Sequence, residues 1–174
     1  MSAALTRNYN LGRLGNAGDR LVIEADETER SAIAQLAQIL SVPRFVAEVT
    51  LAKLGPTRYQ LDYRLEAGVE QACVVTLEPV AATMSRSFRR ELHFIGTGAR
   101  RPADSELDLS GGDEEEPEEI ESLHYDLAGP ALEEFLLGLD PYPRRPGVEF
   151  DPGQAGDPPP ESPFAILKSL KSRT

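Results

Sequence analysis

The sequence has little cysteine, few aromatic residues and no tryptophan. Its single cysteine, Cys73, excludes an internal disulfide and a Cys-x-x-Cys metal pair. No apolar run reaches the roughly 18 residues that a membrane helix needs. The first residues, Met1–Arg7, are followed by polar side chains rather than by the apolar core of a signal peptide. We therefore expect a cytoplasmic protein without a membrane partner.

Motifs typical of enzymes and nucleotide-binding proteins are also missing. The chain has no nucleophile-elbow serine, no P-loop, no dinucleotide-binding glycine pattern and no zinc-protease His-Glu-x-x-His. The two histidines, His93 and His124, lack ligand spacing, and we interpret them as surface residues. Cys73 is either a reactive thiol or a small buried side chain, and its place among apolar residues favours burial. We predict no enzymatic activity, no cofactor, no metal and no small-molecule substrate.

The net charge of −11 arises almost entirely from one segment. Residues 102–124 contain ten Asp or Glu and no Lys or Arg, whereas the rest of the chain is close to neutral. A run such as Gly111–Glu119 has too few apolar side chains to form a core, so we predict a mobile acidic loop over 102–120. This loop is either a solvated linker or a contact for a basic partner.

The centre of the chain predicts an antiparallel meander. From Tyr59 to Leu65 apolar and polar side chains alternate, which is the period of a strand with one buried face. We expect a turn at Ala67 and Gly68, a second strand around Cys73, and its end at Pro79, which cannot donate a ladder hydrogen bond. A third strand is predicted from the apolar residues Phe88, Leu92 and Phe94.

Other segments complete an α+β fold with a mostly antiparallel, curled sheet covered by two helices. Asp26 and Glu29 form a capping-box pattern before a helix predicted over 28–40, with the apolar stripe Ile33, Leu36, Ala37 and Leu40. We expect Pro43 to close this helix. Further strands are predicted at 20–25, 45–54 and 121–127, and a second helix at 131–139. Residues 1–140 would then form one domain.

A tail follows over 141–174. Seven of the residues from Pro141 to Pro160 are proline, which predicts a stiff, irregular segment. Ser162 and Pro163 then begin a short basic amphipathic helix. Its apolar stripe, formed by Phe164, Leu167 and Leu170, either packs back on the sheet or docks on a partner.

The folded part carries one basic cluster in the sequence. Its members are Arg86, Arg89, Arg90, Arg100 and Arg101. Because guanidinium groups match phosphate oxygens, the cluster could contact RNA. It could equally pair with the acidic loop that follows. The two interpretations are compatible if the acidic loop covers the cluster in the free protein, as an RNA mimic, and is displaced when RNA binds.

Three stretches together resemble the YceD-like family, the large ribosomal RNA subunit accumulation proteins of bacteria and plastids. The first is the Cys73–Val80 stretch, whose form is similar to the alphaproteobacterial variant. The second is the acidic loop with the strand, helix and proline-rich segment after it. The third is the closing stretch Pro163–Lys171. Thr76 stands where many relatives have a second cysteine, so a metal or redox role of that pair is not expected here.

The resemblance implies an accessory, non-enzymatic role in ribosome biogenesis, supporting accumulation of large-subunit (23S) ribosomal RNA. The implied partner is ribosomal RNA or the pre-ribosomal large-subunit particle. The alternative is an acidic adaptor or chaperone for a basic ribosomal protein, without RNA contact. RNA binding that depends on Arg86, Arg89 and Arg90 would favour the first, and capture of a basic protein through 102–124 would favour the second.

Overall fold

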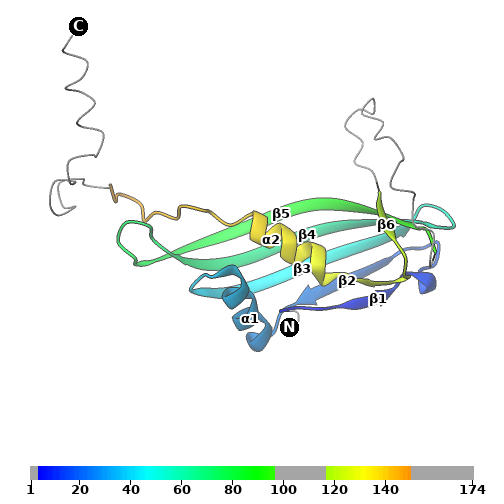
Figure 1. Cartoon of the computed structure of the whole chain (residues 1–174), viewed down its shortest axis with the longest axis horizontal. Helices are drawn as coiled ribbons and strands as arrows, with labels where there is room; N and C mark the ends of the chain where they lie inside the picture. The colour runs from blue at the N-terminus through cyan, green and yellow to red at the C-terminus, as the bar shows by residue number, and fades with distance from the viewer. Residues whose placement is uncertain (1–3, 97–116, 150–174) are drawn as a thin grey trace, which may run out of the picture.

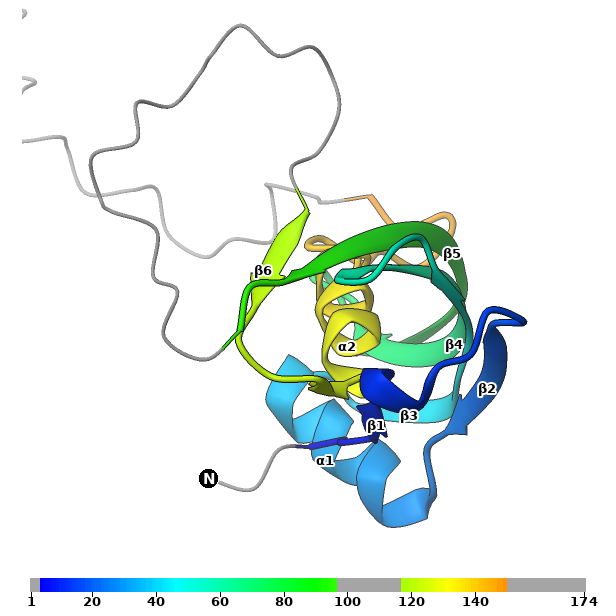
Figure 2. The ribbon, with the colours of Figure 1, turned by 90° about the vertical axis from the view of Figure 1, so that its right-hand side faces the viewer.

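The structure, a computed structural model, describes residues 4–96 and 117–149. It consists of two helices and a five-stranded, mostly antiparallel sheet with the strand order β2-β3-β4-β5-β6. A separate two-stranded sheet pairs β1 (Asn8–Asn10) with β7 (His124–Asp126). The large sheet is curled but not closed, and seen along its strands it curves around α2 (Figure 2). The predicted α+β class is confirmed.

Three long strands, β3 (Ser41–Lys53), β4 (Arg58–Ala72) and β5 (Pro79–Phe94), form most of the sheet (Figure 1). The predicted turn at Ala67 and Gly68 is wrong, because β4 runs straight through it and pairs Gly68 with both Arg44 and Thr83. The alternation of buried side chains simply continues through Ala67 and Val69 to Gln71. The chain turns later, over 73–78.

This turn, which we call the hairpin tip (residues 73–78), connects β4 to β5. The Cys73 N–H donates to the Glu78 carbonyl at 2.8 Å, and the Leu77 N–H donates to the Cys73 carbonyl at 2.9 Å. Leu77 adopts a left-handed conformation with φ of 62°. Pro79 begins β5 rather than ending a strand, and the first position of a strand is where a proline is tolerated.

Helix α1 spans Glu27–Ala37 and ends three residues before the predicted boundary. Its capping box is present as predicted: Asp26 accepts the Glu29 N–H at 2.8 Å, and Glu29 accepts the Asp26 N–H at 3.0 Å. Gln38, with φ of 55°, ends the helix in a left-handed cap. Leu36 and Leu40, expected on the buried stripe, are half exposed, and Pro43 lies inside β3 instead of closing the helix.

Helix α2 spans Ala128–Leu137 and lies in the concave face of the sheet (Figure 2). The predicted helix is confirmed, although it begins three residues earlier because Asp126 accepts the Ala128 N–H at 3.1 Å. Its fully buried Phe135 meets Phe45 of β3 edge-on, with 5.5 Å between ring centroids. Leu132 and Leu136 of this helix, and Leu139 just after its end, are partly buried against the core as expected.

Strand β6 (Glu118–Ile120) lies within the segment that was predicted to be a mobile loop. It pairs in parallel with the end of β5, and Ile120 is almost completely buried in the core. Ile120 is thus the apolar residue of this acidic run that packs in the core. The rest of the predicted loop, 102–116, lies outside the described residues, as do 150–174. The predicted strand over 121–127 is present as β7.

The two faces of the sheet differ because side chains alternate along each strand. Odd-numbered residues of β4 point to the concave face and are buried under α2, while even-numbered residues are partly or fully exposed on the convex face. β2 (Asp19–Glu24) forms one edge of this sheet, as predicted from 20–25.

Candidate functional site

The predicted basic cluster is divided between the two faces of the sheet. Arg86 and Arg90 pair in register with Leu65 and Leu61, so they share the parity of the concave face. Arg89 pairs with Asp62 and belongs to the convex face. Neighbours in a strand point to opposite faces, and these three arginines therefore do not form one patch. Arg100 and Arg101 lie outside the described residues.

Two of these arginines are bound to carboxylates of the folded body. Arg89 Nε donates to Asp62 Oδ1 at 2.7 Å, and Arg90 Nη2 contacts Glu133 Oε2 of α2 at 3.1 Å. Burial raises the pKa of Asp62, but the hydrogen bonds from Arg89 and Gln60 outweigh it and leave this pKa below its ordinary value. Each of these two ion pairs neutralises an arginine charge that would otherwise attract a phosphate group.

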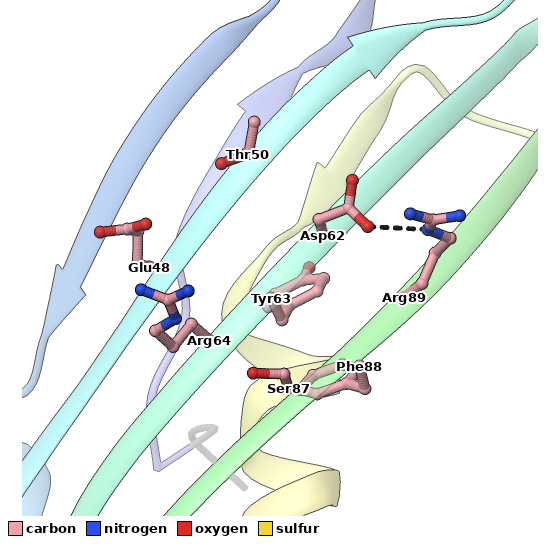
Figure 3. Close-up of a pocket in the computed structure, with 8 residues that line it drawn as sticks. All are labelled: Glu48, Thr50, Asp62, Tyr63, Arg64, Ser87, Phe88 and Arg89. Carbon is pink, nitrogen blue, oxygen red and sulfur yellow. Dashed lines mark hydrogen bonds and ion pairs between the residues drawn. The ribbon is translucent and has the colours of Figure 1, made fainter.

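The convex face has a shallow hollow of about 460 Å³ at its centre (Figure 3). Side chains of both charges line it, with Glu48 and Asp62 beside Arg64 and Arg89. Glu48 also forms an ion pair with Arg20 of β2. The polar lining is completed by Thr50 and Ser87. Positive and negative side chains therefore face each other across neighbouring strands. Because their charges largely cancel, this surface contributes little to affinity for a polyanion.

Aromatic rings of the central strands point the other way. Tyr63 and Phe88 stack face to face on the concave side, with 4.6 Å between centroids. Tyr59 and Phe45 are buried there too. The Tyr63 hydroxyl is buried with no hydrogen-bond partner among the described residues, and burial raises its pKa. The convex face thus lacks Tyr or Phe rings on β3–β5 that could stack on unpaired bases.

Cys73 lies at the hairpin tip and its side chain is closed to solvent, which agrees with the predicted burial. The Arg145 N–H donates to its sulfur at 3.5 Å. The pKa of the thiol falls to about 6, chiefly through a hydrogen bond from the Thr76 side chain, and further through N–H groups of Arg145, Thr76 and Val75. Because the tip projects from the body, desolvation opposes this only weakly (Figure 1).

A second segment, 140–145, is fastened to the same tip. The Val74 N–H donates to the Pro143 carbonyl at 2.9 Å, and Gln71 Nε2 donates to the Asp140 carbonyl at 2.9 Å. Arg145 also forms an ion pair with Glu78. Sequence reasoning placed this segment in an irregular tail and missed its attachment. The available signal was Gln71, a polar residue at a buried strand position.

The remaining predicted site residues, Phe164, Leu167 and Leu170, lie outside the described residues. Within residues 4–96 and 117–149 no group of three His, Cys, Asp or Glu side chains is arranged to hold a metal ion. No helix in that same part of the chain is long and apolar enough to cross a membrane.

Comparison with protein families connects this arrangement to a known group. The model of the family described as large ribosomal RNA subunit accumulation protein YceD matches residues 61–171. The chain belongs to the YceD family. The match covers more than half of the chain, from β4 through α2 and into the tail, so it includes the hairpin tip and the segment fastened to it. Comparisons with curated proteins and with solved structures gave no match.

Proposed function

We propose that this YceD-family protein is a non-enzymatic ribosome-biogenesis factor that supports accumulation of large-subunit (23S) ribosomal RNA in the cytoplasm. The observation that carries the proposal is the family match over residues 61–171. The pKa of the Cys73 thiol, about 6, favours the reactive thiolate, but burial keeps a substrate from reaching it. Its sulfur is closed to solvent and is held by hydrogen bonds within the hairpin tip.

Arg86 and Arg90 are the described members of the basic cluster that share a face, four residues apart on β5 beside α2. Glu133, which pairs with Arg90, is itself two-thirds exposed. An RNA phosphate can therefore replace this carboxylate at low cost, because an exposed ion pair contributes at most about 1 kcal/mol. We propose these two arginines, rather than the whole cluster, as the RNA contact of the folded body.

A second candidate is an acidic adaptor or chaperone for a basic ribosomal protein. Its support is the charge of the described body, where Asp and Glu outnumber Lys and Arg. Three exposed glutamates, Glu118, Glu119 and Glu121, extend the acidity of 102–116 onto β6 and the turn after it. Such a surface attracts a polycation and repels RNA backbone.

Ultraviolet crosslinking of the intact protein in cells, followed by separation of RNA and protein adducts, tests both candidates. RNA contact predicts 23S fragments, and their yield should fall in the double variant Arg86→Gln/Arg90→Gln. Arg44→Gln is the matched control, because Arg44 forms an exposed ion pair with Glu66 on the convex face. Protein adducts with a Lys- or Arg-rich ribosomal protein, with no 23S fragments, would replace the first candidate by the second.

A further inference from the structure

The hairpin tip exposes apolar side chains that the folded body leaves uncovered. Val74 and Leu77 belong to the tip itself, and Tyr142 belongs to the segment fastened to it. Their exposed fractions are 45%, 76% and 71%. We call Val74, Leu77 and Tyr142 the tip surface. It lies at the end of the sheet opposite the β3–β4 turn (Figure 1).

The tip surface is held in place by backbone and side-chain contacts. The Val74–Pro143 hydrogen bond joins its two segments, and the Arg145–Glu78 ion pair closes them on the other side. Leu77 adopts a φ of 62°, a conformation that costs free energy for a leucine and that glycine or asparagine would adopt more readily. This strained, exposed position therefore carries a large apolar side chain that the turn itself does not require.

The chain itself contains a segment that fits this surface. Residues 162–171 carry the apolar stripe of Phe164, Leu167 and Leu170, with Lys168 and Lys171 between and after them. The segment leaves the body from the right place, because Arg145 is bound to Cys73 and the last described residue is Glu149. The 12 residues from 150 to 161 can span at most about 45 Å when fully extended.

We propose that residues 162–171 dock on the tip surface of the same chain, with the apolar stripe covering the exposed side chains of the tip. A short tether gives the segment an effective concentration in the millimolar range. Even a contact with an intrinsic Kd of about 1 mM is then occupied for about half of the time or more. The docking needs no partner and does not rest on the proposed function.

A photo-crosslinker at the segment tests the docking in the full-length protein. With p-benzoylphenylalanine in place of Phe164, the proposal predicts intramolecular adducts with residues 74–77 and with Tyr142. Their yield should not change when the protein is diluted about tenfold, because the reaction is within one chain. Leu77→Asn should remove most of the adduct while keeping the turn, since asparagine tolerates a positive φ. Leu77→Gly, which suits the same backbone, should do the same.

Leu54→Asn is the matched control, because Leu54 is a half-exposed leucine in the β3–β4 turn, between the end of β3 and the start of β4. This variant should leave the adduct yield unchanged. Adducts elsewhere on the body would overturn the proposal, and so would adducts between two chains whose yield rises with concentration. The proposal would also be overturned if the protein with the crosslinker at position 164 and an unchanged tip surface gave no adducts. Thermal unfolding of each variant, compared with the parent chain, verifies that the body remains folded.

Discussion

The backbone N–H of Arg145 donates to the sulfur of Cys73 at 3.5 Å, across 72 positions of the sequence. This contact connects the proline-rich segment to the end of the longest hairpin in the fold. The sulfur of Cys73 also accepts hydrogen bonds from the turn that follows it, so one buried side chain organises both segments. These hydrogen bonds join the turn and the 140–145 segment at one sulfur atom.

Stability of the tip should depend on pH through Cys73. Hydrogen bonds from Thr76 and from backbone N–H groups lower the pKa of the thiol from 9.0 to about 6. A lowered pKa stabilises the folded state in full above pH 9, and this contribution is lost as the pH falls toward 6. Urea unfolding at pH 9 and pH 6 should therefore show a larger loss of stability for the parent chain than for Cys73→Ser. Equal losses in both would contradict the assignment.

Phe135 should be the side chain of α2 that matters most for folding. It is fully buried and meets Phe45 edge-on across the concave face. Truncation leaves a cavity that the sheet cannot close, so Phe135→Ala should lower the free energy of unfolding by about 3–5 kcal/mol. Leu137→Ala, on the exposed side of the same helix, should change it by less than about 0.5 kcal/mol. Denaturant titration of both variants measures the difference.

Leu77→Gly should leave the fold as stable as before or more stable. A left-handed conformation costs an L-residue about 1–2 kcal/mol, and glycine avoids most of this cost but loses more backbone entropy on folding. The comparison uses a background in which Phe164→Ser and Leu170→Ser are present both with Leu77 and with Leu77→Gly. In this background we expect Leu77→Gly to raise the free energy of unfolding by up to about 1 kcal/mol. That background separates turn strain from docking. A clear loss of stability would show that Leu77 packs within the body.

The capping box of α1 should contribute measurably. Asp26 accepts the Glu29 N–H, and its replacement by alanine leaves that donor without its partner. Asp26→Ala should lower the free energy of unfolding by about 1 kcal/mol. Glu27→Ala, one residue later in the first turn, removes a charge of the same sign but no capping bond and should cost about half as much or less. Equal effects would mean that only the charge matters.

Alternation and capping patterns predicted much of this fold from local information. The buried parity from Tyr59 to Leu65 and the Asp26–Glu29 box are short-range signals, and both are confirmed. Ala67 and Gly68 are typical turn residues, but the alternation of buried side chains continues past them to Gln71, and this alternation marks the true length of the strand. Glycine is tolerated in a strand when its neighbours pair on both sides, as they do here.

Two features of the candidate sites depend on contacts that the sequence does not encode locally. The arginines are adjacent in the sequence, but the strand period sends Arg89 and Arg90 to opposite faces, where Asp62 and Glu133 bind them. The attachment of 140–145 to the hairpin tip joins residues about 70 positions apart. The proline-rich composition of 141–160 predicted an irregular tail, and composition alone does not indicate which residues such a segment contacts.

The most direct test of the central claim is to deplete this protein and measure the ratio of large- to small-subunit ribosomal RNA, with a sucrose-gradient profile of the same cells. The account predicts a falling ratio and missing large subunits, both restored by the parent chain. The variant Cys73→Ser should also restore them, because the proposed role involves no chemistry at the thiol. An unchanged ratio after depletion would contradict a role in accumulating large-subunit ribosomal RNA.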